Sequence, residues 1–123
     1  TDITGFGLGG HLLEVCQASQ LNAEVDITKI PLLSKVDYYQ KLGCVPGGTL
    51  RNYDSYSDSI CELSDFERDI LFDPQTSGGL LVTVSTEGEK EFLKMTKENG
   101  LELKAIGQLT EESSSEKRIN LKK

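Results

Sequence analysis

The chain has 123 residues, of which 37% are hydrophobic and 27% charged, a composition typical of one globular domain. Its formal net charge of −7 opposes binding to a phosphate backbone, so we expect no nucleic-acid partner. Three cysteines without a CxxC pair, no apolar run near the ~20 residues of a membrane span, and no visible secretory signal argue against a disulfide framework, a structural zinc site and a membrane partner.

Apolar spacing predicts alternating helices and strands along the chain. In the first half we expect a strand end or linker at residues 2–4, a helix from Gly5 to about Ser19, a half-buried strand at 22–27, a short helix at 32–43 and a long loop from Cys44 to Glu62. Three- and four-residue spacing supports the helices, and alternation supports the strand. A loop of about 20 residues is often functional, or is disordered without a partner domain.

In the second half, two capping boxes mark helix starts, Ser64 with Glu67 and Thr86 with Glu89. We expect a helix at 64–72, a buried strand at 80–85, a helix at 86–100, a strand at 101–109, a polar turn at 111–117 and an edge strand at 118–123. The class is α+β: a layered α/β sandwich in one domain, residues 1–123. Its sheet is mixed, mostly antiparallel, with four or five strands under three or four helices.

The first eleven residues, TDITGFGLGGH, hold four glycines, an acid and the only histidine of the chain. Glycine in a helix costs roughly 0.5–1 kcal/mol relative to alanine, so four cost on the order of 2–4 kcal/mol. Either close packing of the helix or the close approach of a ligand to its backbone would offset that cost. Free N–H groups at a helix start favour an anion such as phosphate.

Asp2 precedes this turn, where its charge opposes a bound phosphate. The helix dipole favours an anion by only about 0.3–1 kcal/mol, whereas a carboxylate about 4 Å from a phosphate charge is repelled by about 1–4 kcal/mol. A Mg²⁺ ion between them removes the conflict, because it binds one or two carboxylates together with substrate phosphates. Asp2 is therefore either a metal ligand facing a nucleotide or a helix-cap or turn aspartate.

Four further features leave alternatives or indicate packing. His11 is either a hydrogen-bonded packing residue or a catalyst, and Cys16 is most simply a small core residue. Arg51, in PGGTLRN, either pairs with phosphate or carboxylate or holds the loop through an internal ion pair. In DPQTSGG, consecutive N–H groups form either an anion nest or a tight helix-to-strand connection. The sequence holds no P-loop and no Ser/His/Asp set.

Taken together, TDITGFGLGGHLLEV, VPGGTLRN and LFDPQTSGGLLV resemble the C-terminal domain of the selenophosphate synthetase (selenide, water dikinase) family, in the superfamily of aminoimidazole ribonucleotide synthetase. The resemblance implies a partly ferredoxin-like fold and a Mg²⁺-dependent reaction in which selenide, ATP and water give selenophosphate, AMP and phosphate. It also implies a cytoplasmic homodimer. In the family's enzyme an N-terminal domain, absent here, carries a nucleophilic cysteine or selenocysteine, a lysine, a nucleotide-binding loop and two metal-binding aspartates. Because the sequence starts at Thr1, we expect it to be cut from that longer protein.

The resemblance also implies roles for particular residues. Asp2 matches the remaining metal ligand of the family, for Mg²⁺. The candidates for nucleotide binding, which match motif positions, are Thr4, Gly5, Gly7, Thr76, Ser77 and Gly78. His11 also matches a motif position, without an assigned role. No catalytic residue lies in this chain, so we expect it to be inactive without its N-terminal domain, with selenide and ATP as the substrates of the whole enzyme.

The chain departs from the family pattern at two positions. A bulky residue usually stands where this chain has Gly9, and a cysteine often stands where it has Phe72. We expect looser helix packing at Gly9 and a simple core change at Phe72. Two other functions stay open: a related ATP-dependent enzyme of the thiamine-monophosphate kinase or aminoimidazole ribonucleotide synthetase type, and a stand-alone binding module without catalysis.

Overall fold

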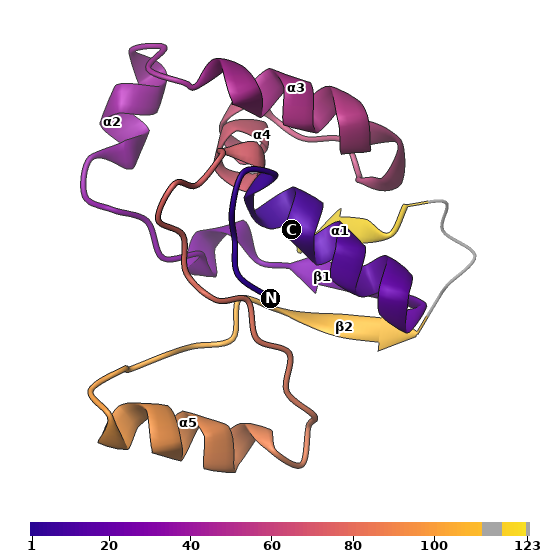
Figure 1. Cartoon of the computed structure of the whole chain (residues 1–123), viewed down its shortest axis with the longest axis vertical. Helices are drawn as coiled ribbons and strands as arrows, with labels where there is room; N and C mark the ends of the chain where they lie inside the picture. The colour runs from indigo at the N-terminus through magenta and orange to yellow at the C-terminus, as the bar shows by residue number, and fades with distance from the viewer. Residues whose placement is uncertain (112–116, 123) are drawn as a thin grey trace.

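The computed structural model describes residues 1–111 and 117–122, which form one sheet and a set of helices (Figure 1). The helices are α1 (Gly7–Ser19), α2 (Val36–Lys41), α3 (Gly47–Tyr56), α4 (Asp65–Phe72) and α5 (Glu89–Glu98), with short 3-10 helices η1 (Ile27–Lys29) and η2 (Ser57–Ser59). The strands are β1 (Leu21–Val25), β2 (Gly107–Glu111) and β3 (Ile119–Leu121). None of these helices has the length and apolar character needed to cross a membrane.

β1 is the central strand of the sheet, whose order is β2-β1-β3. It pairs antiparallel with β2, from Leu21 opposite Glu111 to Val25 opposite Gly107, and parallel with β3. The sheet is therefore mixed, and the predicted α+β class is confirmed. The described residues contribute three strands to it, not the four or five predicted. Residues 112–116 of the predicted polar turn lie outside the described residues.

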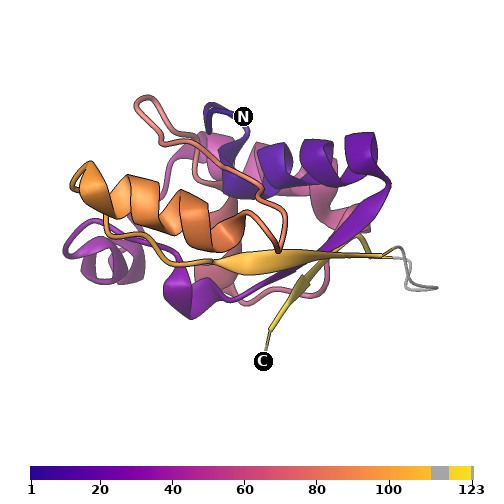
Figure 2. The ribbon, with the colours of Figure 1, turned by 90° about the horizontal axis from the view of Figure 1, so that it is seen from below.

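The core lies between the sheet and the helices. α1 packs on β1 and also contacts α3 and α4, so these three helices share one apolar centre (Figures 1 and 2). The buried apolar residues of this centre are Leu12, Leu13, Cys16, Ala23, Val25, Ile60, Leu71, Phe72 and Ile119. The prediction that Cys16 belongs to the core is confirmed, and burial raises the pKa of its thiol.

Several predicted element ends are confirmed. At the start of α4, the Glu67 N–H donates to Ser64 Oγ at 3.3 Å and the Ser64 N–H donates to Glu67 Oε2 at 2.7 Å, so the capping box forms. Gly43 and Gly100 follow α2 and α5 with φ angles of 78° and 79°. This left-handed conformation favours glycine and ends both helices.

The predicted loop at residues 44–62 is wrong, because most of it forms α3 and η2. Thr49, Tyr53 and Tyr56 recur at four- and three-residue spacing and turn inward. Thr49 is fully buried, and the rings of Tyr53 and Tyr56 lie 5.5 and 6.4 Å from the Phe72 ring, centre to centre. The helix escapes prediction because its inner face consists of threonine and tyrosine, not aliphatic residues, and because its first turn holds two glycines.

The predicted strand at residues 80–85 is also wrong, and the predicted strand at residues 101–109 is wrong over residues 101–106. Residues 80–85 pair only through an isolated bridge between Leu80 and Asp2, and the second segment becomes a strand only from Gly107. Alternating apolar residues form a strand only where a neighbour completes the ladder of hydrogen bonds, and here Leu80 stays 76% exposed. These two segments lead to and from α5, which lies apart from α1, α3 and α4 (Figure 1).

The predicted capping box at the start of α5 does not form. α5 begins at Glu89, and Gly88 is its N-cap without a side-chain cap bond. The Gly88 N–H donates instead to the carbonyl and the hydroxyl of Ser85, at 3.0 and 3.2 Å. The turn before α5 is thus closed by Ser85, and Thr86 does not cap the helix.

Gly9 and Phe72 share one volume where α1 meets α4. A Cβ atom on Gly9 would lie 2.9 Å from Cε1 and Cζ of Phe72, a distance that real Cβ contacts do not reach, and Phe72 is fully buried. The expectation of looser packing at Gly9 is therefore wrong, because the phenylalanine ring fills the space that the glycine leaves. The two departures from the family pattern therefore compensate each other, because the small residue at position 9 of α1 makes room for the large residue at position 72 of α4.

We predict that Gly9→Leu and Phe72→Cys each destabilise the fold and that the double variant recovers part of the loss. Phe72→Cys leaves a cavity worth about 2–4 kcal/mol, and Gly9→Leu overpacks by about 1–3 kcal/mol, less the gain from leucine's helix propensity. Urea unfolding should give a favourable coupling of about 1–3 kcal/mol. Gly9→Leu with Phe92→Cys, on the distant α5, is the additive control. Additivity in both pairs would show that Gly9 and Phe72 are independent.

Candidate functional site

The start of the chain is paired with the DPQTSGG segment, far away in sequence. The Thr1 N–H donates to the Leu81 carbonyl at 3.0 Å, and the Leu81 N–H donates to the Thr1 carbonyl at 2.8 Å. Two residues on, the Ile3 N–H donates to the Gly79 carbonyl at 2.9 Å. The first and third motifs thus lie side by side.

The Thr4 carbonyl joins the same segments at the turn. It accepts hydrogen bonds from the N–H groups of Gln75 and Gly7, each at 3.1 Å. The backbones approach very closely here, since a Cβ on Gly78 would lie 2.1 Å from the Ile3 oxygen. This approach requires glycine at position 78.

Asn52 ties the second motif to the other two. Its Nδ2 group donates to the Gly5 carbonyl at 2.8 Å and to the Phe72 carbonyl at 3.1 Å. In the same motif, a Cβ on Gly48 would lie 3.1 Å from Cγ of Pro74. The three motifs therefore converge in one place.

Close packing accounts for three of the four opening glycines. A Cβ on Gly7 would lie 2.8 Å from the Leu71 oxygen, and Gly7 has a φ of 71°. Cβ atoms on Gly9 and Gly10 would lie 2.9 and 2.7 Å from the nearest side-chain atoms. Gly5 differs, because a Cβ there would meet nothing within 4 Å. The backbone at Gly5 is thus the part of this turn that is open to a ligand.

Asp2 has an exposed and uncommitted carboxylate. Ile3 is buried between exposed Asp2 and Thr4, the alternation expected of an extended segment. Within residues 1–111 and 117–122 the carboxylate makes no hydrogen bond or ion pair, and α1 starts at the N-cap Phe6 without a side-chain cap bond. Asp2 therefore does not cap this helix, and its carboxylate is free to bind a cation.

A run of free donors precedes the chain segment paired with Asp2. The backbone N–H groups of Thr76, Ser77 and Gly78 donate to no carbonyl in the described chain. The side chains of Thr76 and Ser77 are exposed and likewise make no hydrogen bond there. Consecutive free N–H groups of this kind are suited to an anion.

His11 is buried and held between two polar side chains. Its Nε2 lies 3.0 Å from Thr4 Oγ1, and its Nδ1 lies 3.1 Å from Glu14 Oε2. The Phe6 ring packs against it, with the ring centres 5.6 Å apart. The burial of His11 fits its interpretation as a packing residue. Its hydrogen bond to Thr4, however, connects it to a candidate nucleotide-binding residue. Sequence reasoning missed Glu14, which the three-residue spacing from His11 could have indicated.

Arg51 makes no ion pair with any residue that the structure describes, so the predicted internal ion pair is not found there. Its side chain is exposed, and one guanidinium nitrogen lies 3.6 Å from where a Cβ on Gly48 would stand. The guanidinium thus lies along the glycine turn of the second motif, available to an anion.

The two acids at the end of α4 are less suited to a cation than Asp2. Asp69 is buried and accepts hydrogen bonds from Arg68, at 2.9 and 2.7 Å, and from Gln40, at 2.8 Å. Burial raises the pKa of Asp73, a hydrogen bond from Gln75 opposes this rise, and the charge of Asp69 adds to it. Asp73 thus favours its neutral form more than an ordinary aspartate does.

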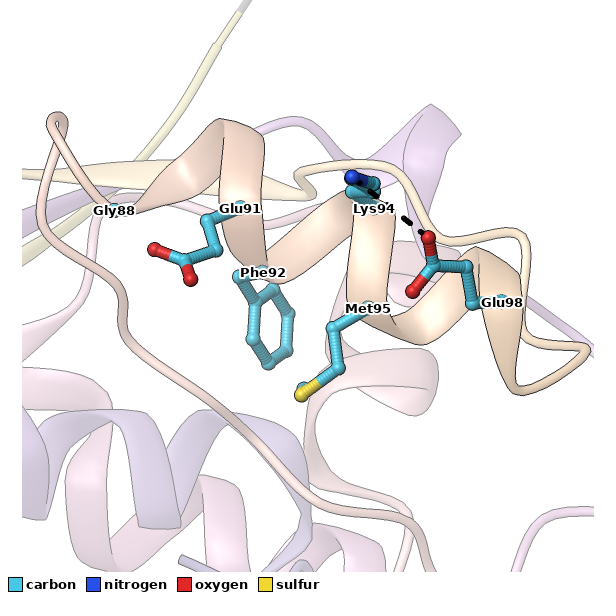
Figure 3. Close-up of a pocket in the computed structure, with 6 residues that line it drawn as sticks. All are labelled: Gly88, Glu91, Phe92, Lys94, Met95 and Glu98. Atoms are coloured by element: carbon cyan, nitrogen blue, oxygen red, sulfur yellow. Dashed lines mark ion pairs between the residues drawn. The ribbon is translucent and has the colours of Figure 1, made fainter.

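Two surface hollows are relevant to locating the site. One, of about 610 Å³, borders the motifs and includes Ile3, Asp73 and Gln75 in its wall. The other, of about 510 Å³, lies on α5, where Phe92 and Met95 point from the same side of the helix (Figure 3). Its lining residues are Gly88, Glu91, Phe92, Lys94, Met95 and Glu98. No motif residue lines this second hollow, so it is not the candidate site.

In the described part of the chain, no three side chains of His, Cys, Asp or Glu gather as a metal site. Asp2 can supply one ligand. The other ligands of a cation bound there would come from water, from a bound phosphate or from another part of the protein.

We predict that Asn52 is needed for stability because it holds three motifs together. Asn52→Ala removes two donors and should lower the free energy of unfolding by about 1–3 kcal/mol, and Asn52→Asp should lower it more, because a carboxylate would face two carbonyl oxygens. Urea unfolding of the chain measures both. Asp54→Ala, on the exposed side of α3, is the control and should stay within about 0.5 kcal/mol. An Asn52→Asp variant as stable as that control would refute the role.

Comparisons with known proteins identify the family of this chain. Residues 1–120 match the family model of the AIR synthase related protein, C-terminal domain. The chain is 58% identical over 109 residues to the selenide, water dikinase of Aeromonas hydrophila, covering 89% of this chain and 32% of that protein. It is 55% identical over 114 residues to the selenide, water dikinase of Pseudomonas putida (93% and 33% covered) and 51% identical over 113 residues to that of a Sulfurovum species (92% and 33%).

The chain thus spans about a third of the length of the curated relatives it matches. The resemblance that the three motifs indicated is confirmed by these matches. The chain belongs to the AIR synthase related protein family, as its C-terminal domain, and the three curated relatives named above are selenide, water dikinases.

Proposed function

We propose that this chain is the C-terminal domain of an enzyme that makes selenophosphate, converting selenide, ATP and water into selenophosphate, AMP and phosphate. The names of relatives that are 51–58% identical support this reaction. The observation that carries the proposal is the convergence of the three motifs around a free carboxylate and a run of free N–H groups. A site for a nucleotide and its metal ion needs both.

In this proposal Asp2 holds a Mg²⁺ ion that faces the nucleotide. The carboxylate is a hard oxygen ligand of the type that Mg²⁺ prefers. Without a cation, Asp2 would repel a phosphate at the neighbouring N–H groups by about 1–4 kcal/mol. When bound, the ion supplies charge neutralisation and fixes the orientation of the phosphates. Thr76, Ser77 and Gly78 bind phosphate through their N–H groups, and the open backbone at Gly5 lets the nucleotide approach.

In this proposal the chain supplies binding groups, and the N-terminal domain supplies the nucleophile. Cys16 is unsuited to attack, because it is buried and its raised pKa disfavours the thiolate. The nucleophilic cysteine or selenocysteine, the lysine and the two further metal-binding aspartates belong to an N-terminal domain in this proposal. The whole enzyme is a cytoplasmic homodimer, and the 123-residue chain alone is inactive.

Asp2→Asn in the full-length enzyme tests the metal role. Losing the charge should raise the Mg²⁺ concentration needed for half-maximal AMP release by about 5- to 1,000-fold, since the lost attraction is about 1–4 kcal/mol. The fold should survive, because the Asp2 side chain makes no hydrogen bond or ion pair with the residues that the structure describes. AMP release is measured with selenide and ATP over a Mg²⁺ series.

Asp54→Asn, which removes an exposed charge from α3, is the matched control and should keep the wild-type Mg²⁺ dependence. An unchanged Mg²⁺ dependence in Asp2→Asn would remove the metal role. Phosphorylation of thiamine monophosphate, with no selenide-dependent AMP release by the wild type, would replace the proposed reaction. AMP release by the 123-residue chain alone would contradict its inactivity.

A further inference from the structure

We propose that the Thr4 hydroxyl faces the metal ion as a hydrogen-bond acceptor and that His11 and Glu14 fix it in that role. The proposal rests on the function above and changes one part of it. The family resemblance groups Thr4 with the nucleotide-binding residues, which would make its hydroxyl a donor to phosphate. The hydrogen bonds around His11 instead make the Thr4 hydroxyl an acceptor toward a bound group.

The protonation of the His11 ring follows from its two partners. Nδ1 lies 3.1 Å from a carboxylate oxygen of Glu14, and a carboxylate can only accept. In the neutral ring the hydrogen therefore sits on Nδ1 and is donated to Glu14. Nε2 is left with a lone pair, which can only accept. The Glu14 carboxylate thus selects the tautomer of the ring.

The orientation of Thr4 follows from that tautomer. Thr4 Oγ1 lies 3.0 Å from His11 Nε2, so the hydroxyl must donate its single hydrogen to the ring. Its remaining lone pairs accept only from donors or bind cations. Phosphate oxygens are acceptors and would be repelled. A Mg²⁺ ion, or a water molecule bound to one, is the partner that suits this oxygen.

The position of Thr4 agrees with this role. Asp2 and Thr4 are both exposed and flank buried Ile3, so their side chains lie on the same side of an extended segment. That side is where the proposed ion binds to Asp2. His11 itself is only 7% exposed and packs against Phe6, which keeps water from competing for Nε2. His11 and Glu14 are positioning residues, because they act through Thr4.

The first test needs no activity. Nitrogen-15 NMR of the chain at neutral to mildly alkaline pH distinguishes the two neutral tautomers of the single histidine. We expect the hydrogen on Nδ1, and we expect Glu14→Leu to release the ring into a mixture of tautomers. A ring protonated on Nε2 in the wild-type chain would overturn the proposal, because Thr4 would then keep its hydrogen for phosphate.

The second test uses the full-length enzyme and Mn²⁺ as a probe for Mg²⁺, bound in the presence of ADP and followed by electron paramagnetic resonance. Thr4→Val, which keeps the shape and removes the hydroxyl, should weaken Mn²⁺ binding about three- to tenfold, the range for one hydrogen bond. Thr4→Ser should restore it. His11→Gln keeps an acceptor near Nε2 and should retain more Mn²⁺ affinity than His11→Leu.

A Thr4→Val enzyme with unchanged Mn²⁺ affinity and a raised KM for ATP would overturn the proposal, since it would make Thr4 a phosphate donor. Unchanged values of both would overturn it as well. Circular dichroism checks that each variant is folded, and the tautomer measurement on the wild-type chain stands even where a variant fails to fold. A wild-type enzyme without selenide-dependent AMP release would remove the proposed function and leave the tautomer result intact.

Discussion

The backbone pairing of residues 1–4 with residues 75–81 is the interaction on which the candidate site depends. Four hydrogen bonds cross between these segments, and each lies between 2.8 and 3.1 Å. They bring the aspartate of one motif beside the free N–H groups of another, although the two are more than seventy positions apart in sequence. Because Ile3 is buried between them, Asp2 and Thr4 must face the same way.

The glycines allow both this backbone pairing and the close packing beneath it, and different glycines serve each purpose. Gly7, Gly9 and Gly78 stand where any Cβ atom would collide with a neighbour, whereas Gly5 faces open space. Close packing thus explains Gly7 and Gly9, and the open space at Gly5 is compatible with the approach of a ligand. Phe72 shows how such packing tolerates change, because its ring occupies the volume that a larger residue at position 9 would need.

The sequence predicted those elements whose signals are local. The alternating residues of β1, the capping box at Ser64 and the left-handed glycines after α2 and α5 depend on near neighbours. α3 was missed because its buried face is made of Thr49 and two tyrosines. Residues 80–85 were taken for a buried strand because their pattern is correct, but a strand also needs a partner, which no local pattern reveals.

The candidate site, like the fold, could be predicted only where its signals are local in the sequence. The motifs identified Asp2 and Thr4 as candidates: the charge of Asp2 beside a glycine-rich turn indicated a cation, and Thr4 matched a motif position of the family. The sequence could not indicate that Asn52 joins all three motifs, because its two acceptors are backbone carbonyls, 47 and 20 positions away. Nor could it orient the Thr4 hydroxyl, which depends on the tautomer of a buried histidine three positions before Glu14.

We propose that the carboxylate of Asp2 binds a metal ion shared with a nucleotide, and a crystal structure of the full-length enzyme with Mg²⁺ and a non-hydrolysable ATP analogue would show this contact. We expect an Asp2 oxygen about 2.1 Å from a Mg²⁺ ion that also contacts a phosphate oxygen. A nucleotide-bound structure with Mg²⁺ in place and both Asp2 oxygens beyond about 4 Å from it, too far even for a direct ionic contact, would overturn this role.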